Sequence, residues 1–587
     1  MCGICGSVGF DPDLVRKMNN AMNHRGPDDS GTFINGKVCL GHTRLSIIDT
    51  SPDGHQPMSN EDNTIWVVYN GEIYNFKDLR KDLENRGHKF KSNTDTEVIV
   101  HLYEDHGVDC LKYLRGMFSF AIWDINRQVL FAARDRLGEK PFLYSLQGDK
   151  FVFASELRAI LKSDAVKKDL DTKALYDYFL YGSVQSPQTL VKNVSQLLPG
   201  HYLLIKNGRL TIRKYWTLDF TGSVNNKKKE KEHLEQIEQM VEESVKIRMV
   251  SDVPLGAFLS GGIDSSTIVA LMRKYATGPL KTLSVIFEES DYDERRFSAE
   301  IANIFATDHT QILLKKSEML NELPAILEAM DQPSVDGFNT FVISNVARKA
   351  GLTVALSGLG GDEIFAGYSF FKTLPRFMRL CSPIRILPAN LNTRAFRLSA
   401  RFVNSRKLLK ASYAAFKCSN LQQLHSIQRM IFLPEEAAEF LPASRPQLPF
   451  SQETFDFDPV NVLSFLEINT YLQNTLLHDT DRMSMANSLE IRSPFLDHIL
   501  VEQLAQIPGS LKVGNDYPKR LLVKAARKYL PESIYNRKKQ GFAFPFEIWL
   551  RNELRGFCDE HLAVNKIKEI PALDPARINK IWQDFSN

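Results

Sequence analysis

The first third of the chain is a succession of short segments in which apolar and polar residues alternate. Glycine, aspartate and asparagine separate these segments, which span residues 36–49, 64–75, 116–124, 128–138 and 141–155. Because successive side chains of a β-strand point to opposite faces of a sheet, alternation with a period of two predicts strands, and the separating residues favour turns. The pattern predicts a two-layer β structure with a few helices as far as about residue 205.

The hydrophobic pattern changes at a polar stretch near the middle of the chain. Glycine, serine, asparagine and lysine cluster between Gly222 and Lys231, which is typical of a solvated linker. Apolar residues then recur with helical spacing and predict one buried helix face formed by Leu234, Ile237, Met240, Val241 and Val245. We therefore expect a first domain, a linker and a second domain over residues 1–210, 211–232 and 233–587.

The second half contains two apolar strands that each run into a glycine-rich loop. The first loop is "SGGIDS" at residues 260–265, directly before a helical pattern, and the second lies within residues 352–368. Loops at the carboxyl ends of parallel strands meet in one crevice of an open α/β sheet. Backbone N–H groups in such a turn, at the start of a helix, form a cradle for phosphate oxygens. Since no lysine closes the loop as in GxxxxGK[ST], transfer of a γ-phosphate is not expected.

Length and composition are those of an ordinary globular enzyme. At 587 residues the chain is too long for one hydrophobic core, and its net charge of +3 argues against a whole-protein affinity for nucleic acid or membrane. No apolar run approaches the roughly 20 residues that cross a bilayer, and Asp11 and Asp13 lie where a signal peptide would need an apolar core. Seven cysteines, an odd number, do not resemble a disulfide framework. We expect a cytoplasmic protein with reduced thiols.

Cys2 directly follows the initiator methionine and becomes the first residue when that methionine is removed. Its α-amino group, with a pKa of ~7.7–8.0, then lies beside its thiol and can accept the thiol proton at neutral pH. Cys2 is therefore expected to be an N-terminal nucleophile, whereas Cys5 is expected to be a small apolar strand residue. A metal clamp or redox pair is the alternative, but no second pair of cysteine or histidine ligands follows at short spacing.

Six stretches of the first half resemble one known family. They are "MCGI", "NHRGPDDSG", "RLSIID", "YNGEIYN", "TDTEV" and "RDRLGEKPFLY". These stretches are similar to the glutaminase domain of class II glutamine amidotransferases, in the form found in glutamine-hydrolysing asparagine synthetases. The resemblance implies an α+β N-terminal-nucleophile domain, a two-layer β sandwich with helices, in which Cys2 attacks the side-chain amide of glutamine and releases ammonia.

The same resemblance assigns residues to the binding of glutamine. The Asn70 side chain and the Gly71 backbone N–H would form the oxyanion hole. Arg44 would bind the α-carboxylate of glutamine, while Glu72 and Asp95 would face its α-amine. Taken alone, Asn-Gly is a common hairpin turn, and an arginine or aspartate on a loop is usually solvated. A cysteine at the second position, together with the order of the motifs, favours the glutaminase.

The second half resembles the same family. Its SGGxDS loop is similar to the pyrophosphate-binding loop of enzymes that split ATP into AMP and pyrophosphate, which implies an α/β ATP-pyrophosphatase-type synthetase domain with a parallel sheet and a helical extension. The resemblance implies that ATP contacts Leu259, Ser260, Gly261, Gly262, Asp264, Ser265, Val285, Ser357 and Gly358. It further implies that Asp264 and Asp362 share a Mg²⁺ ion and that Lys519 touches the phosphates. Val285 is explained equally well as a core strand residue.

The two halves together imply a glutamine-dependent, ATP-consuming ligase that makes asparagine from aspartate and releases AMP. One departure concerns the acceptor: Leu359 stands where bacterial asparagine synthetases have an acid, and residues 330–351 hold no arginine at the place that reads aspartate. The same chemistry on another carboxylate, such as a sugar acid of polysaccharide synthesis, is therefore an alternative. A non-catalytic glutamine-sensing scaffold is a second alternative, disfavoured because the site residues are intact.

A basic stretch at residues 370–417 has eleven lysines and arginines and no acidic residue. One interpretation is a set of amphipathic surface helices whose arginines lie over apolar neighbours. The other is a docking site for an anionic acceptor or an anionic surface.

The sequence also leaves open whether the protein forms a homodimer, and whether a closed passage carries ammonia between the two sites.

Overall fold

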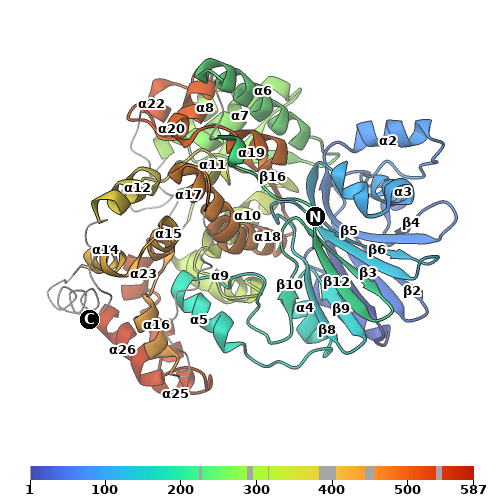
Figure 1. The fold of residues 1–587 in the computed structure, drawn as a ribbon, viewed down its shortest axis with the longest axis horizontal. Helices are drawn as coiled ribbons and strands as arrows, with labels where there is room; N and C mark the ends of the chain where they lie inside the picture. The colour runs from blue at the N-terminus through green and yellow to red at the C-terminus, as the bar shows by residue number, and fades with distance from the viewer. Residues whose placement is uncertain are drawn as a thin grey trace.

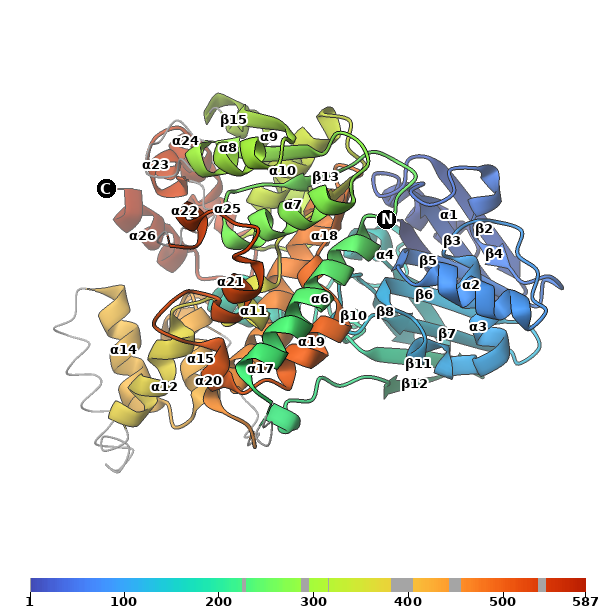
Figure 2. The same cartoon turned by 90° about the horizontal axis from the view of Figure 1, so that it is seen from above.

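A computed structural model describes the chain in two parts that lie side by side (Figure 1). It describes residues 2–223, 228–286, 295–314, 316–381, 405–442, 455–536 and 545–586. The strand-rich first part lies at one end of the molecule, and the C-terminal helices α23–α26 lie at the opposite end (Figures 1 and 2). Among the described residues, no helix combines the length and the apolar character needed to span a bilayer.

The first part is built on two six-stranded antiparallel sheets. The first sheet has the order β10-β8-β9-β1-β3-β2, with strands Ser195–Gln196, Leu143–Gln147, Lys150–Ala154, Gly3–Val8, Val38–Arg44 and Asp29–Asn35. The second has the order β12-β11-β7-β6-β5-β4, with strands Arg209–Lys214, His201–Lys206, Val129–Arg134, Gly116–Asp124, Ile65–Ile73 and Met58–Ser59. Each of the five alternating segments contains at least one of these strands, so the strand prediction is confirmed.

Apolar residues fill the space between the two sheets. Ile4 and Leu40 of the first sheet are fully buried in the same cluster as Val68, Ala121 and Leu130 of the second. Helices α1 (Asp13–Ala21) and α4 (Leu157–Lys162) pack on the first sheet, and α2 (Phe76–Asn85) and α3 (Glu97–His106) on the second. The predicted two-layer β sandwich with helices is therefore confirmed.

The second part is built on a five-stranded sheet in which every neighbouring pair is parallel. Its order is β15-β14-β13-β16-β17, with strands Asp308–Leu313, Lys281–Ile286, Leu255–Phe258, Val354–Leu356 and Glu490–Arg492. Helices cover both faces. One side carries α6 (Glu230–Arg248), α7 (Ile263–Tyr275), α8 (Arg295–Ile304), α19 (His498–Ala505) and α21 (Arg520–Ala526). The other carries α9 (Lys316–Ala329), α10 (Gly337–Lys349) and α18 (His478–Met485), which confirms the predicted parallel α/β domain.

The predicted helix after the linker is α6, and its apolar face is buried as expected. Ile237, Val241 and Val245 are fully buried, while Leu234 and Met240 pack against the same cluster. The predicted linker, residues 211–232, begins within β12 and ends within α6. Residues 224–227 of that linker lie outside the described residues.

A helical extension packs beside the parallel sheet and forms a separate apolar cluster with α5 (Thr172–Tyr181) of the first part. It comprises α12 (Phe370–Leu380), α14 (Arg406–Lys417), α15 (Leu421–Arg429), α16 (Pro434–Phe440) and α17 (Pro459–Glu467). A π-helical segment, Ile468–Leu477, joins α17 directly to α18. The remaining short helices are α11 (Gly361–Ile364), α20 (Gly509–Lys512), α22 (Glu532–Tyr535), α23 (Phe546–Arg551), α24 (Arg555–His561), α25 (Val564–Ile567) and α26 (Pro575–Ser586).

The basic stretch contributes α12 and α14 to this extension. Arg406 lies over the Phe432 ring and forms an ion pair with Glu436, and Lys410 donates a hydrogen bond to the Met430 carbonyl. These two cations therefore stabilise helix packing, as in the amphipathic-helix interpretation. Four other cations of the stretch, Arg385, Arg394, Arg397 and Arg401, lie outside the described residues, so docking of an anionic partner stays a prediction.

Candidate active sites

Cys2 lies immediately before β1, next to Asn70 of β5. The Cys2 backbone nitrogen donates a hydrogen bond to Asn70 Oδ1 at 2.9 Å. The Asn70 side chain is fully buried, and its Nδ2 has no hydrogen-bond partner among the described residues. A buried donor without a partner is costly, so this N–H group is available to an oxygen that binds beside the thiol. Burial raises the pKa of the Cys2 thiol, although the positive chain terminus and Arg44 oppose this.

Gly71 also faces this pocket, but the sheet itself explains why it is glycine. A Cβ at Gly71 would collide with the Met117 carbonyl on the neighbouring strand β6. The close approach of the two backbones therefore requires glycine at this position, whatever binds in the pocket.

Arg44, the last residue of β3, has its guanidinium held in one place by backbone carbonyls. Nη1 donates to the Ser51 carbonyl at 2.8 Å, and Nη2 donates to the Asp49 carbonyl. Gly54 makes this position possible, because a Cβ there would collide with the guanidinium. The immobilised Arg44 guanidinium lines the same pocket as Cys2. A guanidinium held in this way suits recognition of a carboxylate.

Asp95 and Glu72 line the same pocket as Cys2. Asp95 Oδ2 accepts hydrogen bonds from the Tyr69 hydroxyl at 2.7 Å and the Ile73 N–H at 2.8 Å. Burial raises the pKa of Asp95 to about 6 and raises that of Glu72 well above its usual range. The structure thus brings all six residues predicted to handle glutamine to one place.

Glu72 also contacts the second part of the chain, which the sequence did not predict. Arg492 of β17 forms an ion pair with Glu72 Oε2 at 2.9 Å through Nη2 and with Glu490 Oε1 at 2.6 Å through Nε. Arg492 is fully buried, and its carbonyl accepts a hydrogen bond from the Ser357 N–H at 2.9 Å. One residue therefore joins the pocket at Cys2 to the second glycine-rich loop.

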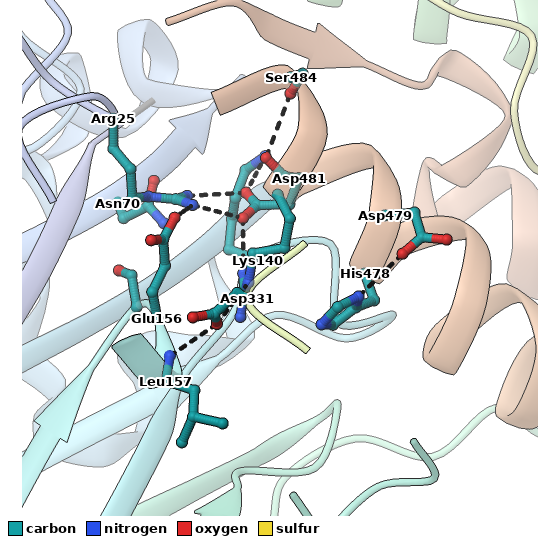
Figure 3. A network of polar contacts seen from close by, with 12 residues as sticks. Arg25, Asn70, Lys140, Glu156, Leu157, Asp331, His478, Asp479, Asp481 and Ser484 are labelled. Carbon is teal, nitrogen blue, oxygen red and sulfur yellow. Dashed lines mark hydrogen bonds and ion pairs between the residues drawn. The ribbon is translucent and has the colours of Figure 1, made fainter. Parts of the chain in front are cut away.

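A buried ionic network holds the two parts together (Figure 3). It also reaches the Cys2 backbone. Arg25 donates to both carboxylate oxygens of Asp481 at 2.9 and 3.0 Å, to Glu156 Oε1 at 2.9 Å, and to the Cys2 carbonyl at 3.0 Å. The Arg25 side chain is completely buried. The cations Arg25 and Lys140 overcome the effect of burial and lower the pKa of Asp481 to about 2. This network fixes the position of the Cys2 backbone relative to α18.

The first glycine-rich loop connects β13 to α7, as predicted. Gly261 has a φ of +71°, and a Cβ there would lie 2.6 Å from the Phe297 backbone. Within the loop, the Gly262 N–H donates to Ser260 Oγ at 3.2 Å, and the Ser260 and Ser265 hydroxyl oxygens lie 3.1 Å apart. The remaining N–H groups at the start of α7 are those that a phosphate group can use.

The second loop, between β16 and α11, lies against the first. A Cβ at Gly358 would be 2.7 Å from Asp264 Cβ, and Gly360 has a φ of +89°. A cavity of about 320 Å³ lies at these strand ends. Its lining includes eight of the nine residues predicted to contact ATP, all except Gly261. Val285 both lines the cavity and packs in an apolar cluster, so its contact with ATP stays a prediction beside its role in the core.

Lys519 brings the two predicted magnesium ligands to one point. It precedes α21 with a left-handed φ of +48°, and its side chain is only 3% exposed. Its Nζ forms an ion pair with Asp264 and lies 3.0 Å from Asp362 Oδ1. The two carboxylates outweigh burial and raise the pKa of Lys519. Two convergent carboxylates are a donor set that fits Mg²⁺.

The rest of the cavity holds residues that the sequence did not single out. These are Asp336, Thr340 and Asp479, and they line it beside Leu359, the residue that stands in place of an acid. Burial and the charge of Asp479 raise the pKa of Asp336. Within the described part of the lining, the charged side chains are all acidic. Asp336 and Thr340 lie within residues 330–351, which drew attention only for a missing arginine, and Asp479 carries no local signal of its own.

Comparisons with known proteins place both parts of the chain. A family model described as "Asparagine synthase" matches residues 236–587, and one described as "Glutamine amidotransferase domain" matches residues 1–216. The Bacillus subtilis (strain 168) protein named "Asparagine synthetase [glutamine-hydrolyzing] 1" is 34% identical over 94% of this chain and 88% of its own length. A second protein of that strain, "Asparagine synthetase [glutamine-hydrolyzing] 3", is 32% identical over 92% of this chain and 87% of its own.

A solved structure also shows similarity to this chain. Glutamine phosphoribosylpyrophosphate amidotransferase from B. subtilis, complexed with ADP and GMP, is 16% identical with a TM-score of 0.31. The match covers 55% of this chain and 92% of that chain.

Proposed function

The chain belongs to the asparagine synthase family, and from this premise we propose that it is a glutamine-hydrolysing asparagine synthetase. In the proposed reaction the protein amidates aspartate with ammonia taken from glutamine and releases AMP and pyrophosphate from ATP. The observation that carries the proposal is that one chain holds two complete sites. The pocket at Cys2 has the groups for amide hydrolysis, and the cavity at the two loops has those for ATP.

At the first site, the Cys2 thiolate would attack the side-chain amide carbon of glutamine, with the thiol proton passing to the α-amine of Cys2. The negative oxygen formed would accept hydrogen bonds from Asn70 Nδ2 and the Gly71 N–H. Collapse of this intermediate breaks the C–N bond, and ammonia leaves with that proton. Water then hydrolyses the remaining thioester to glutamate. Arg44 and Asp95 would hold the α-carboxylate and α-ammonium groups of glutamine.

At the second site, the side-chain carboxylate of aspartate would attack the α-phosphorus of ATP, and pyrophosphate would leave. The loop N–H groups at residues 260–265 would orient the phosphates. Asp264 and Asp362 would hold Mg²⁺, which when bound would neutralise phosphate charge, and Lys519 would stabilise the charge that develops on the phosphate oxygens. Ammonia then attacks the acyl carbon, and AMP leaves.

Aspartate is the acceptor that the cavity and the relatives favour. Asp336 and Asp479 are suited to the α-ammonium group of an amino acid, which a sugar acid does not carry. The comparisons do not favour a sugar acid. Intact groups at both sites also argue against a non-catalytic scaffold.

The proposal is tested by incubating the purified chain with aspartate, glutamine, ATP and Mg²⁺ and following all products by chromatography. We expect asparagine, glutamate, AMP and pyrophosphate in equal amounts. Formation of ADP and phosphate would contradict the adenylation step. A panel of carboxylic acids tests the acceptor, because faster pyrophosphate release with an acid other than aspartate would overturn that assignment.

The Arg492→Gln variant should weaken glutamine binding and leave synthesis from ammonium within about twofold of the wild type. Without Arg492, the buried Glu72 loses the cation that favours its charged form, so it becomes a poorer partner for the α-ammonium of glutamine. We expect the KM for glutamine to rise about tenfold, which corresponds to about 1.4 kcal/mol. Initial rates with glutamine and with ammonium chloride measure both effects.

Arg115→Gln is the matched control. Arg115 also joins the two parts, through Asp497 and Glu243, but it does not contact Glu72. If both variants raise the KM for glutamine equally, the effect comes from loosening the interface and not from Glu72.

A further inference from the structure

Four side chains that the proposed reaction does not use converge at the outer edge of the sandwich. Glu61 lies between β4 and β5, His88 follows α2, and His101 and Glu104 lie on α3. The elements that carry them lie together in Figure 1. One nitrogen of each histidine and one oxygen of each glutamate lie within 4.8 Å of one another, and among the described residues this is the group with such a metal-like arrangement.

Three of the distances within this cluster lie close to those of a tetrahedral zinc site. His101 Nδ1 lies 2.9 Å from Glu104 Oε2 and 3.6 Å from Glu61 Oε2, and His88 Nδ1 lies 3.7 Å from Glu104 Oε2. Ligand atoms bonded to one zinc ion at roughly 2.0–2.2 Å are about 3.3–3.6 Å apart in a tetrahedron. Small side-chain adjustments therefore suffice to bring the four atoms around one ion.

The outer atoms of three of these side chains are already held by neighbours. Glu61 Oε1 accepts from the Lys89 N–H at 2.9 Å, and Glu104 Oε1 accepts from Asn60 Nδ2 at 2.8 Å. His88 Nε2 lies 3.1 Å from Asp105 Oδ1. Such outer contacts orient metal ligands, and that of His88 sets its tautomer. Of the inner atoms, His101 Nδ1 and Glu104 Oε2 share a hydrogen bond at 2.9 Å, which a bound ion would replace.

The fourth side chain, His101, is the buried one. It is 1% exposed, and its Nε2 has no hydrogen-bond partner in the described structure, lying 3.8 Å from Glu97 Oε1. Glu61 is 36% exposed and gives an ion access from solvent. A buried imidazole, a second imidazole and two carboxylates surround the same point.

We propose that Glu61, His88, His101 and Glu104 bind a divalent transition metal, and that the ion is Zn²⁺. Two imidazoles with two carboxylates suit zinc, whereas Mg²⁺ and Ca²⁺ prefer sites made of oxygen alone. The ion would join the turn at residue 61, the segment at residue 88 and α3. Because α3 begins two residues after Asp95, the metal would stabilise the part of the sandwich that borders the pocket at Cys2.

The competing description of the cluster needs no metal. Although burial opposes it, the hydrogen bond to Glu104 and the nearby carboxylates of Glu97 and Glu61 raise the pKa of His101 to about 9. A protonated His101 could then lie among the carboxylates as an ion-pair cluster. The two descriptions differ in whether zinc is retained.

The test uses the untagged full-length chain, stripped with chelator and then titrated with ZnCl₂ in excess Mg²⁺ and without nucleotide. We expect one equivalent of zinc to bind, measured by calorimetry and by elemental analysis after gel filtration. His88→Gln and Glu61→Gln should each weaken binding at least about tenfold. His201→Gln is the control, because His201 on β11 contacts the Pro199 carbonyl and lies outside the cluster.

Replacement of zinc by Co²⁺ gives a second measurement. The wild type should show the strong visible absorption of four-coordinate Co²⁺, and His88→Gln should not. Failure of the wild type to retain zinc would establish the ion-pair cluster and overturn the proposal. Equal affinity in the wild type and both cluster variants would place the metal elsewhere and also overturn it. Glu61→Gln changes an exposed residue, so it remains informative if His88→Gln does not fold.

Discussion

Replacing Cys2 by alanine is expected to abolish glutamine-dependent asparagine formation, lowering the rate at least about 10³-fold, while synthesis from ammonium stays within about twofold of the wild type. Cys2 is the one cysteine among the described residues that line the pocket, so the variant has no thiol there to form a thioester. The cavity at the glycine-rich loops is built by other residues and is unchanged. Asparagine and glutamate are measured with glutamine and with ammonium chloride in turn.

Cys5→Ala serves as the control for loss of a nearby thiol, because Cys5 lies on β1, which Cys2 immediately precedes. Cys5 is fully buried, and its Sγ lies 3.1 Å from Asn19 Oδ1, away from the pocket. We expect its activity with glutamine to remain within about threefold of the wild type. Glutamate formation that persists in Cys2→Ala would contradict the assignment of Cys2 as the nucleophile. This conclusion holds whether or not the second site still makes asparagine.

The second large effect is expected for Lys519→Met, which should lose at least about 10³-fold in asparagine formation with either nitrogen source. Methionine keeps much of the volume but removes the cation between Asp264 and Asp362. The two carboxylates then repel phosphate instead of sharing a positive charge. Aspartate-dependent exchange of labelled pyrophosphate into ATP should fall by the same factor, because adenylation itself is impaired.

The first site provides the folding control for Lys519→Met. Glutamate formation by the variant should remain within about threefold of the wild type, which an unfolded chain could not achieve. Lys512→Met is the matched substitution: Lys512 is buried, donates to Asn461 Oδ1 at 2.6 Å, and has a pKa lowered to about 7 by burial. Lys512 lies outside the cavity lining. If Lys512→Met also lost synthesis completely, the loss in Lys519→Met would reflect removal of a buried lysine and not of a group that contacts phosphate.

Local patterns in the sequence were sufficient to predict the strands and the two glycine-rich loops. Alternation marked the segments that became strands, although β5 and β6 are buried over nearly all of their nine residues because helices cover the outer face of their sheet. A glycine-rich turn between an apolar strand and a helix is likewise a local signal, since Gly261 and Gly360 need positive φ where the strands end. The order of the motifs then led to the residues around Cys2.

Contacts between distant segments could not be predicted in the same way. Glu72 and Arg492 are 420 positions apart, and Arg25 and Asp481 are 456 apart. Arg25 occurs in one of the motif stretches, but nothing in the neighbours of either arginine indicates which acid it contacts. The zinc cluster has the same property, because its four residues come from a loop, an interhelical segment and a helix. Such pairings follow from how completed elements pack.

The hydrogen bond that Arg25 donates to the Cys2 carbonyl has a consequence for protein engineering. An excised first half, or a chimera with a foreign partner, would leave this guanidinium facing water or an unmatched surface where Asp481 belongs. The nucleophile would then lose part of the scaffold that sets its backbone. The two catalytic units are therefore not interchangeable modules, and any transplant must carry a carboxylate equivalent to Asp481 with it.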